Sequence, residues 1–344
     1  MRDSRNPGMY ATDALDDALE ATREFLFPFE ARRWAKLALV AFFLGGIGAE
    51  FPVSSGGGSG GTGGTGEPAE PGVIPTDPAQ LPTEVWLLVG GLIAFAVAFG
   101  LAVAAVRAIM DFVLIESLRE EQVEIRRFAS RRWRQALRLF GFRLIIDLIA
   151  LVIVIVPLLL VFGPLFLGVG GVAMALFGVL LLIPVLIVVS TGSALLNGLT
   201  TVFVVPTMIL QGGGVLDGWR RFWPTLRREW KEYVAYAVVN LVLVIAGGIA
   251  LGIGATLAGI LVLVPFLLLF GGGFALFQIS ATAGVGVLVL ASLLYAAVVA
   301  VAVALLKAPI ITYVRYYALF VLGDTDADLD PIPERRRLVR AERD

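Results

Sequence analysis

The chain has 344 residues, of which 58% are hydrophobic and only 16% are charged, and its net charge is −1. A soluble protein usually carries about a quarter charged residues. Cysteine and histidine are both absent, which excludes a disulfide framework and a thiol nucleophile and removes the usual general base and the commonest metal ligand. Residues 148–216 and 233–306 contain no Asp, Glu, Lys or Arg, and each run far exceeds the roughly 20 residues that span a bilayer. The composition predicts an all-α, polytopic transmembrane helical bundle.

Residues 1–33 are predicted to form a cytoplasmic segment, because they contain no apolar core of a signal peptide. A helix is expected over 12–27, with Leu15, Leu19, Thr22 and Leu26 on one side. Its other positions are acidic: Asp13, Asp16, Asp17, Glu20 and Glu24. A short first span is expected at 34–50.

Residues 51–83 are rich first in glycine and serine and then in proline, which predicts a disordered extracellular loop. Two catalytic patterns occur within it. Gly58-x-Gly60-x-x-Gly63 fits a dinucleotide fingerprint, and Gly57-x-Ser59-x-Gly61 fits a nucleophile elbow. Both motifs need a preceding strand and a following helix, and neither is predicted here, so we assign them no function.

A second span is expected at 84–107, followed by a cytoplasmic basic segment at 108–142. Its last part, 125–142, is predicted to be an interfacial amphipathic helix. One side carries Arg127, Arg131, Arg134 and Arg138. The other side carries Ile125, Ala129, Trp133, Ala136, Leu137 and Phe140.

The leading interpretation of the arginine side is binding of anionic lipid headgroups, at roughly 1 kcal/mol per basic residue. An alternative is that the acidic face of helix 12–27 lies against these arginines. Nucleic acid is not expected as a partner, because the helix is half apolar and the membrane competes for it.

Two further spans are expected at 143–168 and 172–205. A second cytoplasmic basic segment follows at 206–232, with Arg221 and Arg228 as further candidates for headgroup binding. The last spans are expected at 233–268 and 274–307, with a turn or a re-entrant piece near 271–273. Prolines within or near these spans predict kinks or broken ends; they are Pro157, Pro164, Pro184 and Pro265.

Six spans, within a transmembrane domain at 34–318, leave residues 319–344 as a polar cytoplasmic tail with no apolar period. The outer loop and turns contain no arginine or lysine, so the positive-inside rule places both termini in the cytoplasm of a cell-membrane protein. Three spans follow an Arg-Arg-aromatic motif, which suggests three hairpin repeats. The motifs are Arg32-Arg33-Trp34, Arg131-Arg132-Trp133 and Arg220-Arg221-Phe222-Trp223. The alternative is that charges flank every cytoplasmic end by coincidence.

Few polar side chains fall within the spans. Asp147 lies four residues after Arg143, so a local ion pair on one helix face is predicted, and Asp111 after Arg107 has the same explanation. Asn197 and Asn240 are predicted to make interhelical hydrogen bonds, with a polar cavity as the alternative. Gly248-x-x-x-Gly252 predicts close helix packing.

The opening MYATDALDDALEATREFLFPFEARRWAKLALVAFFLGG, the Gly-rich outer loop and the acidic-then-basic tail resemble an uncharacterised membrane family of halophilic archaea. The hairpin layout is loosely similar to the membrane domain found beside glycerophosphodiester phosphodiesterases. These resemblances imply an archaeal source and a topology, and they bring no catalytic residues. The phosphodiesterase domain itself is not expected, because its chemistry needs histidine.

The sequence therefore predicts a non-enzymatic structural, lipid-organising or accessory protein, with no cofactor or metal and with membrane lipids as its partners. The alternative is a transporter or channel for a neutral or hydrophobic substrate. An enzyme ranks third, because clustered acidic residues at the membrane edge are not found.

Overall fold

The computed structural model describes residues 9–44, 83–166 and 171–341, and within these ranges the chain is helical and contains no strand. Of the predicted outer loop at 51–83, residues 51–82 lie outside the described residues, and Thr83 begins the third helix. The helices are α1 (Met9–Leu26), α2 (Ala31–Leu44), α3 (Thr83–Glu120), α4 (Ile125–Phe166), α5 (Val172–Leu199), the π-helix η2 (Thr200–Val204), α6 (Val205–Gln211), α7 (Val215–Arg228), α8 (Trp230–Ile279), α9 (Ala281–Thr325), the 3₁₀-helix η3 (Ala327–Leu329) and α10 (Pro333–Ala341).

Five helical segments among the described residues are long and apolar enough to cross a membrane. They are 83–120, 125–164, 176–211, 230–279 and 281–325. The predicted first span begins in α2, which has 14 residues and a length of about 21 Å, shorter than the roughly 30 Å hydrocarbon core. Residues 45–50 of that span lie outside the described part, so five spans are found where six were predicted.

The long helices extend well past the predicted ends of their spans. α3 continues from the predicted end at 107 to Glu120, and α9 continues from 307 to Thr325. The reason is that both continuations carry side chains which the rest of the protein buries, such as Phe112 and Phe320. A transmembrane prediction stops where charges begin, whereas a helix stops where its packing and hydrogen bonding stop.

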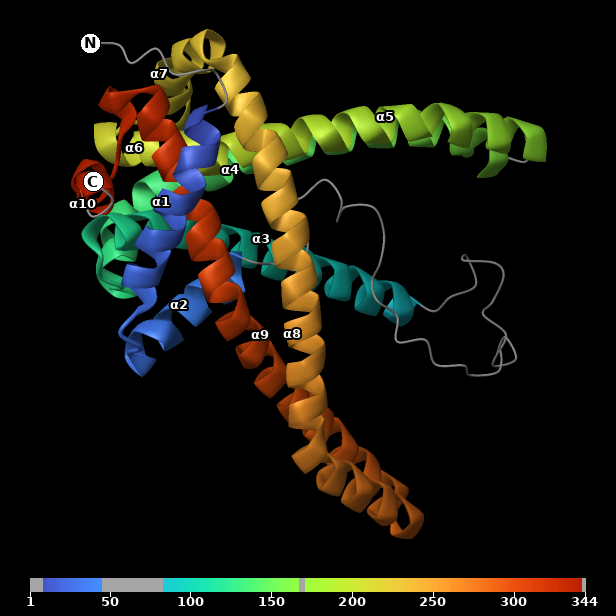
Figure 1. The fold of residues 1–344 in the computed structure, drawn as a ribbon. Coiled ribbons are helices and arrows are strands. Elements are labelled where there is room, and N and C mark those ends of the chain that lie inside the picture. Colours follow the sequence, from blue (N-terminus) through green and yellow to red (C-terminus); the bar gives the residue numbers. More distant parts are fainter. Residues whose placement is uncertain (1–8, 45–82, 167–170, 342–344) are drawn as a thin grey trace.

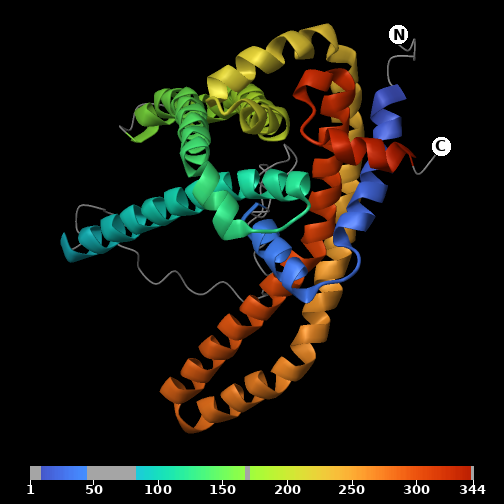
Figure 2. The same ribbon diagram turned by 90° about the vertical axis from the view of Figure 1, so that its left-hand side faces the viewer.

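Burial divides these helices into two halves. In α3, α4 and α8 the most apolar stretch of 18 residues contains no residue that the protein buries. The opposite ends of α3 and α9 are almost completely buried, over 110–118 and 315–323. Figures 1 and 2 show the consequence: α3, the α4–α5 pair and the α8–α9 pair diverge from one packed region that also contains α1, α2, α6, α7 and α10.

The packed region is held together largely by aromatic rings. The ring of Phe203, in the π-helix, stacks on that of Phe222 of α7 with centroids 5.3 Å apart. The edges of Tyr233 and Tyr236, from α8, meet the same Phe203 ring. Burying such side chains contributes about 1.5–3 kcal/mol each, so this region, rather than the diverging arms, supplies most of the tertiary stability.

The first helix packs through a face that overlaps the predicted one, because Thr22 and Leu26 are buried and Leu15 packs against the core. Its buried apolar positions are Ala14, Ala18, Ala21, Phe25 and Leu26, whereas Leu19 is half exposed. The alanines have no bulk beyond Cβ, so they let α1 lie close along α9, the helix with which it makes most of its contacts. The alanines therefore join the predicted Leu15, Thr22 and Leu26 on the packed face, and Leu19 is the predicted residue that lies outside it.

The predicted interfacial helix is the first part of α4, which continues into the span without a break. Its buried face carries Phe128, Gln135, Ala136 and Leu139. Trp133 and Leu137, which were predicted to share the apolar side, remain 48% and 43% exposed. This part of α4 therefore has three faces, one buried, one basic and one apolar but open.

The α8–α9 pair turns at Ser280 and not near 271–273 as predicted. The three glycines lie inside α8, and Ser280 begins α9 by accepting a hydrogen bond from the Ala283 amide. Figures 1 and 2 show α8 bending before this turn; the helix contains Pro265 and continues through it. α4 and α5 also continue through their prolines, so the predicted broken ends are not found.

Glycine packing in this pair follows a different spacing from the predicted motif. A methyl group added at Gly248 or Gly252 would have no neighbouring atom within 4 Å, whereas a Cβ at Gly247 would meet Ile310 at 2.9 Å and one at Gly254 would meet Leu306 at 3.1 Å. The tightest position is Gly284, where a Cβ would overlap backbone atoms of Phe277. Backbone atoms cannot rotate away, so this contact requires glycine.

We expect Gly284→Ala to destabilise the purified protein by about 1–3 kcal/mol, because the added methyl group must push the two helices apart. Gly286→Ala is the matched control, since nothing lies within 4 Å of its Cβ position and alanine favours a helix by up to about 1 kcal/mol. Thermal unfolding in detergent measures both. Equal melting temperatures for the two variants would contradict the close contact.

Candidate functional site

A buried carboxylate lies where the diverging helices meet. The side chain of Asp111, on α3, has no exposed surface. Its Oδ2 accepts a hydrogen bond from Arg143 Nη1 of α4 at 2.9 Å, and its Oδ1 accepts one from Arg315 Nη2 of α9 at 3.0 Å. Arg143 and Arg315 are themselves only 15% and 7% exposed. This Asp111 cluster therefore joins three long helices through charge-assisted hydrogen bonds.

The π-helix after α5 completes the Asp111 cluster. Arg143 Nη2 donates to the hydroxyl of Thr201, and Arg315 Nη1 donates to the carbonyl of the same residue at 3.3 Å. The neighbouring Thr200 hydroxyl accepts a hydrogen bond from the Trp219 indole of α7 at 3.1 Å. A π-turn is a rare irregularity that often marks a functional site. Here it presents two successive threonines to partners on three other helices.

The predicted local pair between Arg143 and Asp147 is wrong. Arg143 turns to Asp111, while Asp147 is exposed and accepts a hydrogen bond from Asn197 Nδ2 at 3.5 Å. A buried carboxylate needs its counter-charge far more than an exposed one does, because it has lost its hydration. Asp111 therefore holds the arginine, although Asp147 lies closer in sequence.

The two asparagines that were predicted to lie within spans differ in their surroundings. Asn197 of α5 reaches across to Asp147 of α4, which is an interhelical bond. The Asn240 side chain, on α8, shows no hydrogen bond within the described part of the chain. The side-chain oxygen of each asparagine is buried without a hydrogen-bond partner among the described residues.

The six predicted headgroup-binding arginines fall into two groups. Arg127 lies 3.2 Å from Glu124, and Arg131 lies 3.2 Å from Glu120 and 3.3 Å from Glu116. Arg221 and Arg228 also have carboxylate partners, Asp328 and Glu229, each at 3.2 Å. Arg134 and Arg138 are exposed, and no carboxylate of the described residues forms an ion pair with either one.

The alternative of an acidic helix lying against these arginines is also wrong. Arg127 and Arg131 form ion pairs with carboxylates at the end of α3 and in the loop that follows it. Two acidic residues of α1 pair with α10 instead: Asp17 lies 3.0 Å from Arg340, and Glu24 pairs with Arg335. Sequence reasoning missed this partner because it assigned no structure to the tail.

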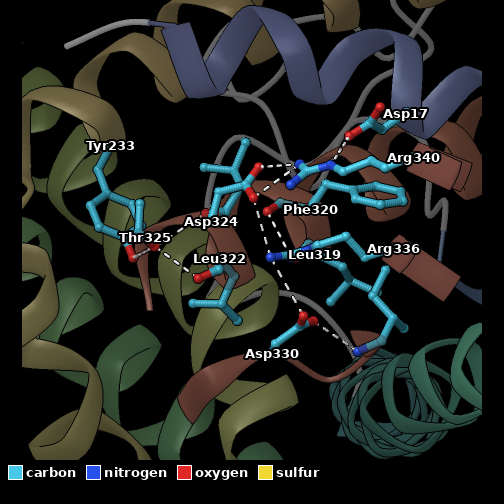
Figure 3. Close-up of polar contacts among 12 residues, drawn as sticks. Asp17, Tyr233, Leu319, Phe320, Leu322, Asp324, Thr325, Asp330, Arg336 and Arg340 are labelled. Carbon is cyan, nitrogen blue, oxygen red and sulfur yellow. Dashed lines mark hydrogen bonds and ion pairs between the residues drawn. The ribbon is translucent and has the colours of Figure 1, made fainter. Parts of the chain in front are cut away.

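The tail is folded onto the packed region through a second ion cluster (Figure 3). Asp324 lies between Arg336 at 3.2 Å and Arg340 at 2.9 Å, and Asp330 lies 3.4 Å from Arg336. Burial raises the pKa of Asp330 and lowers the pKa of Arg336 from their ordinary values. Burial alone would lower the pKa of Arg340, but its hydrogen bond to Asp324 and the charge of that carboxylate raise it.

Buried apolar side chains accompany these charges, and only they could have indicated from the sequence that the tail is ordered. Leu329, Ile332 and Val339 are at most 3% exposed. They are too widely spaced to give an apolar period, so the sequence did not reveal them.

Elsewhere, a hollow lined mainly by acidic residues lies on α1, and no group of three metal-binding side chains occurs among the described residues.

The arrangement defines a helical protein with several membrane-compatible helices that are joined at one polar, tightly packed end. The chain belongs to the family of unknown function DUF7544, whose model matches residues 9–332. No curated protein and no solved structure matches the chain. The match confirms the prediction of a family without an assigned function, and it covers the Asp111 cluster and the carboxylates Asp324 and Asp330 but ends before Arg336 and Arg340.

We expect Asp111→Asn to lower stability by about 3–5 kcal/mol, because it leaves two arginines buried without their shared counter-charge. Asp147→Asn is the matched control: it makes the same chemical change one turn from Arg143, at an exposed position, and is expected to change stability by less than about 1 kcal/mol. Thermal unfolding in detergent compares them. A larger loss for Asp147→Asn would restore the local pair and reject the cluster.

Proposed function

We propose that this is an integral protein of the cell membrane, with six spans arranged as three hairpins and with both termini in the cytoplasm. We propose for it a non-enzymatic role as a structural, lipid-organising or accessory protein. The proposed haloarchaeal relationship and the loose similarity in layout to the phosphodiesterase membrane domain rest on the sequence.

One observation carries the proposal: apolar surface and basic surface are separated to opposite ends of the same helices. The apolar halves are exposed to their surroundings, and residues 83–106, 144–219 and 232–306 contain no lysine or arginine. The packed end carries the basic residues, and three tryptophans there are about half exposed; they are Trp133, Trp223 and Trp230. A basic end with interfacial tryptophans is typical of the cytoplasmic side of a membrane protein.

The three Arg-Arg-aromatic motifs support the hairpin repeat. The side chain of the second arginine of each motif contacts a segment outside its own helix. Arg33 donates to the carbonyl of Glu121, Arg132 to the carboxylate of Glu116, and Arg221 lies beside Asp328. The partner is a backbone carbonyl in the first motif and a carboxylate in the other two, but the shared reach to another segment supports a repeat, with α2 as the start of the first hairpin.

A transporter or channel for a neutral or hydrophobic substrate is the second candidate. It is favoured by the buried side-chain oxygens of Asn197 and Asn240, which have no hydrogen-bond partner among the described residues. A water-accessible cavity reaching both would support transport. An enzyme remains third, and specific, metal-dependent turnover of a lipid by the purified protein would support it.

The orientation is tested by cysteine labelling, which suits a chain with no cysteine of its own. In intact cells we expect a membrane-impermeant maleimide to label Ser59→Cys in the predicted outer loop. Ser130→Cys, at an exposed position on α4, is expected to react only after the membrane is permeabilised. The reverse pattern would invert the topology, and labelling of both in intact cells would reject it.

The lipid role is tested by purifying the wild-type protein in mild detergent and identifying the retained lipids by mass spectrometry. We expect anionic lipids to be enriched over their proportion in the membrane, and added salt to remove them, because exposed charge pairs are screened. Retention of lipids in the same proportions as the membrane would contradict a lipid-organising role.

A further inference from the structure

The predicted headgroup-binding arginines do not share one electrostatic state. At the start of α4, three of the four arginines nearest the loop face an equal number of carboxylates. Arg127, Arg131 and Arg132 lie beside Glu116, Glu120 and Glu124. An anion approaching these arginines would have to displace a carboxylate that is already held in place. Their charge is therefore largely neutralised within the protein.

The next turns of α4 differ. Arg134 and Arg138 are exposed and form no ion pair with the described carboxylates. Arg134 lies over the Trp133 ring at 5.7 Å from its centroid. A guanidinium stacked in this way is held in position by the ring while its N–H groups at the edge stay free to donate.

Helix α7 carries a second face of the same composition. Leu216, Arg220, Trp223 and Arg227 follow one another at spacings of four, three and four residues, which places them on one side of the helix. Leu216 and Trp223 are 64% and 46% exposed, and Arg227 lies 5.0 Å from the centroid of the Trp223 ring. Arg220 is 83% exposed and its carboxylate contact, with Asp217, is long at 3.9 Å.

The α4 face reaches the start of α7. Arg138 Nη1 lies 3.9 Å from the Cβ position of Gly214, the residue before Val215. The lipid-facing part of α4 begins at Leu144 and Ile145, which are exposed apolar residues. Because the rise is 1.5 Å per residue, this part starts about 9 Å from Arg138. The arginines of the α4 face thus lie at the depth of phospholipid headgroups.

Building on the proposed lipid-organising role, we propose that these two faces form the anionic-lipid site: Trp133, Arg134 and Arg138 of α4 with Arg220, Trp223 and Arg227 of α7. The guanidinium groups bind the phosphodiester of an anionic headgroup, and the tryptophans and leucines enter the interface beside it. Arg127, Arg131 and Arg221 pair with carboxylates of other segments instead, and Arg228 pairs with its neighbour Glu229. A soluble acidic protein would not need the exposed leucines and indoles, whereas a membrane surface does.

The test compares paired arginine variants of the full-length protein. Phosphatidylglycerol in mixed micelles is the probe, phosphatidylcholine is its uncharged comparison, and binding is measured by titration. Arg134→Gln/Arg138→Gln and Arg220→Gln/Arg227→Gln are expected each to weaken binding of phosphatidylglycerol about 30-fold. Arg221→Gln/Arg228→Gln is the matched control, because it removes the same charge from a neighbouring face of α7, and less than a twofold change is expected.

Several results would overturn the proposal. If the wild-type protein prefers phosphatidylglycerol but the control pair weakens binding as much as the test pairs, the site is wrong and the lipid role stands. If the wild-type protein shows no preference, the lipid role itself fails. Binding of a short oligonucleotide with the same loss in the same variants would assign the surface to nucleic acid. A melting temperature near that of the wild type shows that each variant is folded, and Arg134→Lys/Arg138→Lys should retain much of the binding.

Discussion

The buried carboxylate of Asp111 and its two arginines set the constraint on which the arrangement of the long helices depends. α3, α4 and α9 reach this point from different parts of the chain and diverge beyond it. A charged group removed from water is tolerated only when its partners are placed correctly. The carboxylate therefore fixes the register of the three helices relative to one another, since a shift of one residue would turn a partner away. Thr201 strengthens this constraint, because both arginines also bind to it.

The apolar halves of the described helices are not joined by a comparable set of charged side chains. Their side chains are equally suited to lipid and to one another, so apolar burial does not specify a single arrangement there. Specificity comes from small residues within the α8–α9 pair and from the polar, aromatic end. This difference explains why the packed end contains both ion clusters and most of the aromatic contacts. It also explains how the tail, although polar in composition, becomes part of the core: its arginines bind carboxylates of α9 and α1.

The basic residues of this protein serve two purposes that composition does not separate. Arg131 and Arg134 lie on the same basic side of α4 and are both exposed, yet one faces Glu116 and Glu120 while the other stacks on Trp133. The same division occurs on α7, where Arg221 reaches Asp328 and Arg227 stacks on Trp223. A stacked arginine keeps donors for an outside anion, whereas a paired arginine has lost them. The position of carboxylates on neighbouring helices therefore decides which arginines are held within the protein.

The sequence by itself determined the helical class and the membrane-compatible segments, because apolar runs of this length leave no other fold that satisfies the backbone. It also located the basic amphipathic part of α4 and the polar residues of the spans. The tertiary structure decided their partners: Arg143 bonds with Asp111, the acidic residues of α1 pair with α10, and the α8–α9 turn lies at Ser280. These choices depend on which groups lose their water when distant helices meet. Local spacing carries no information about that loss, so only the folded chain reveals it.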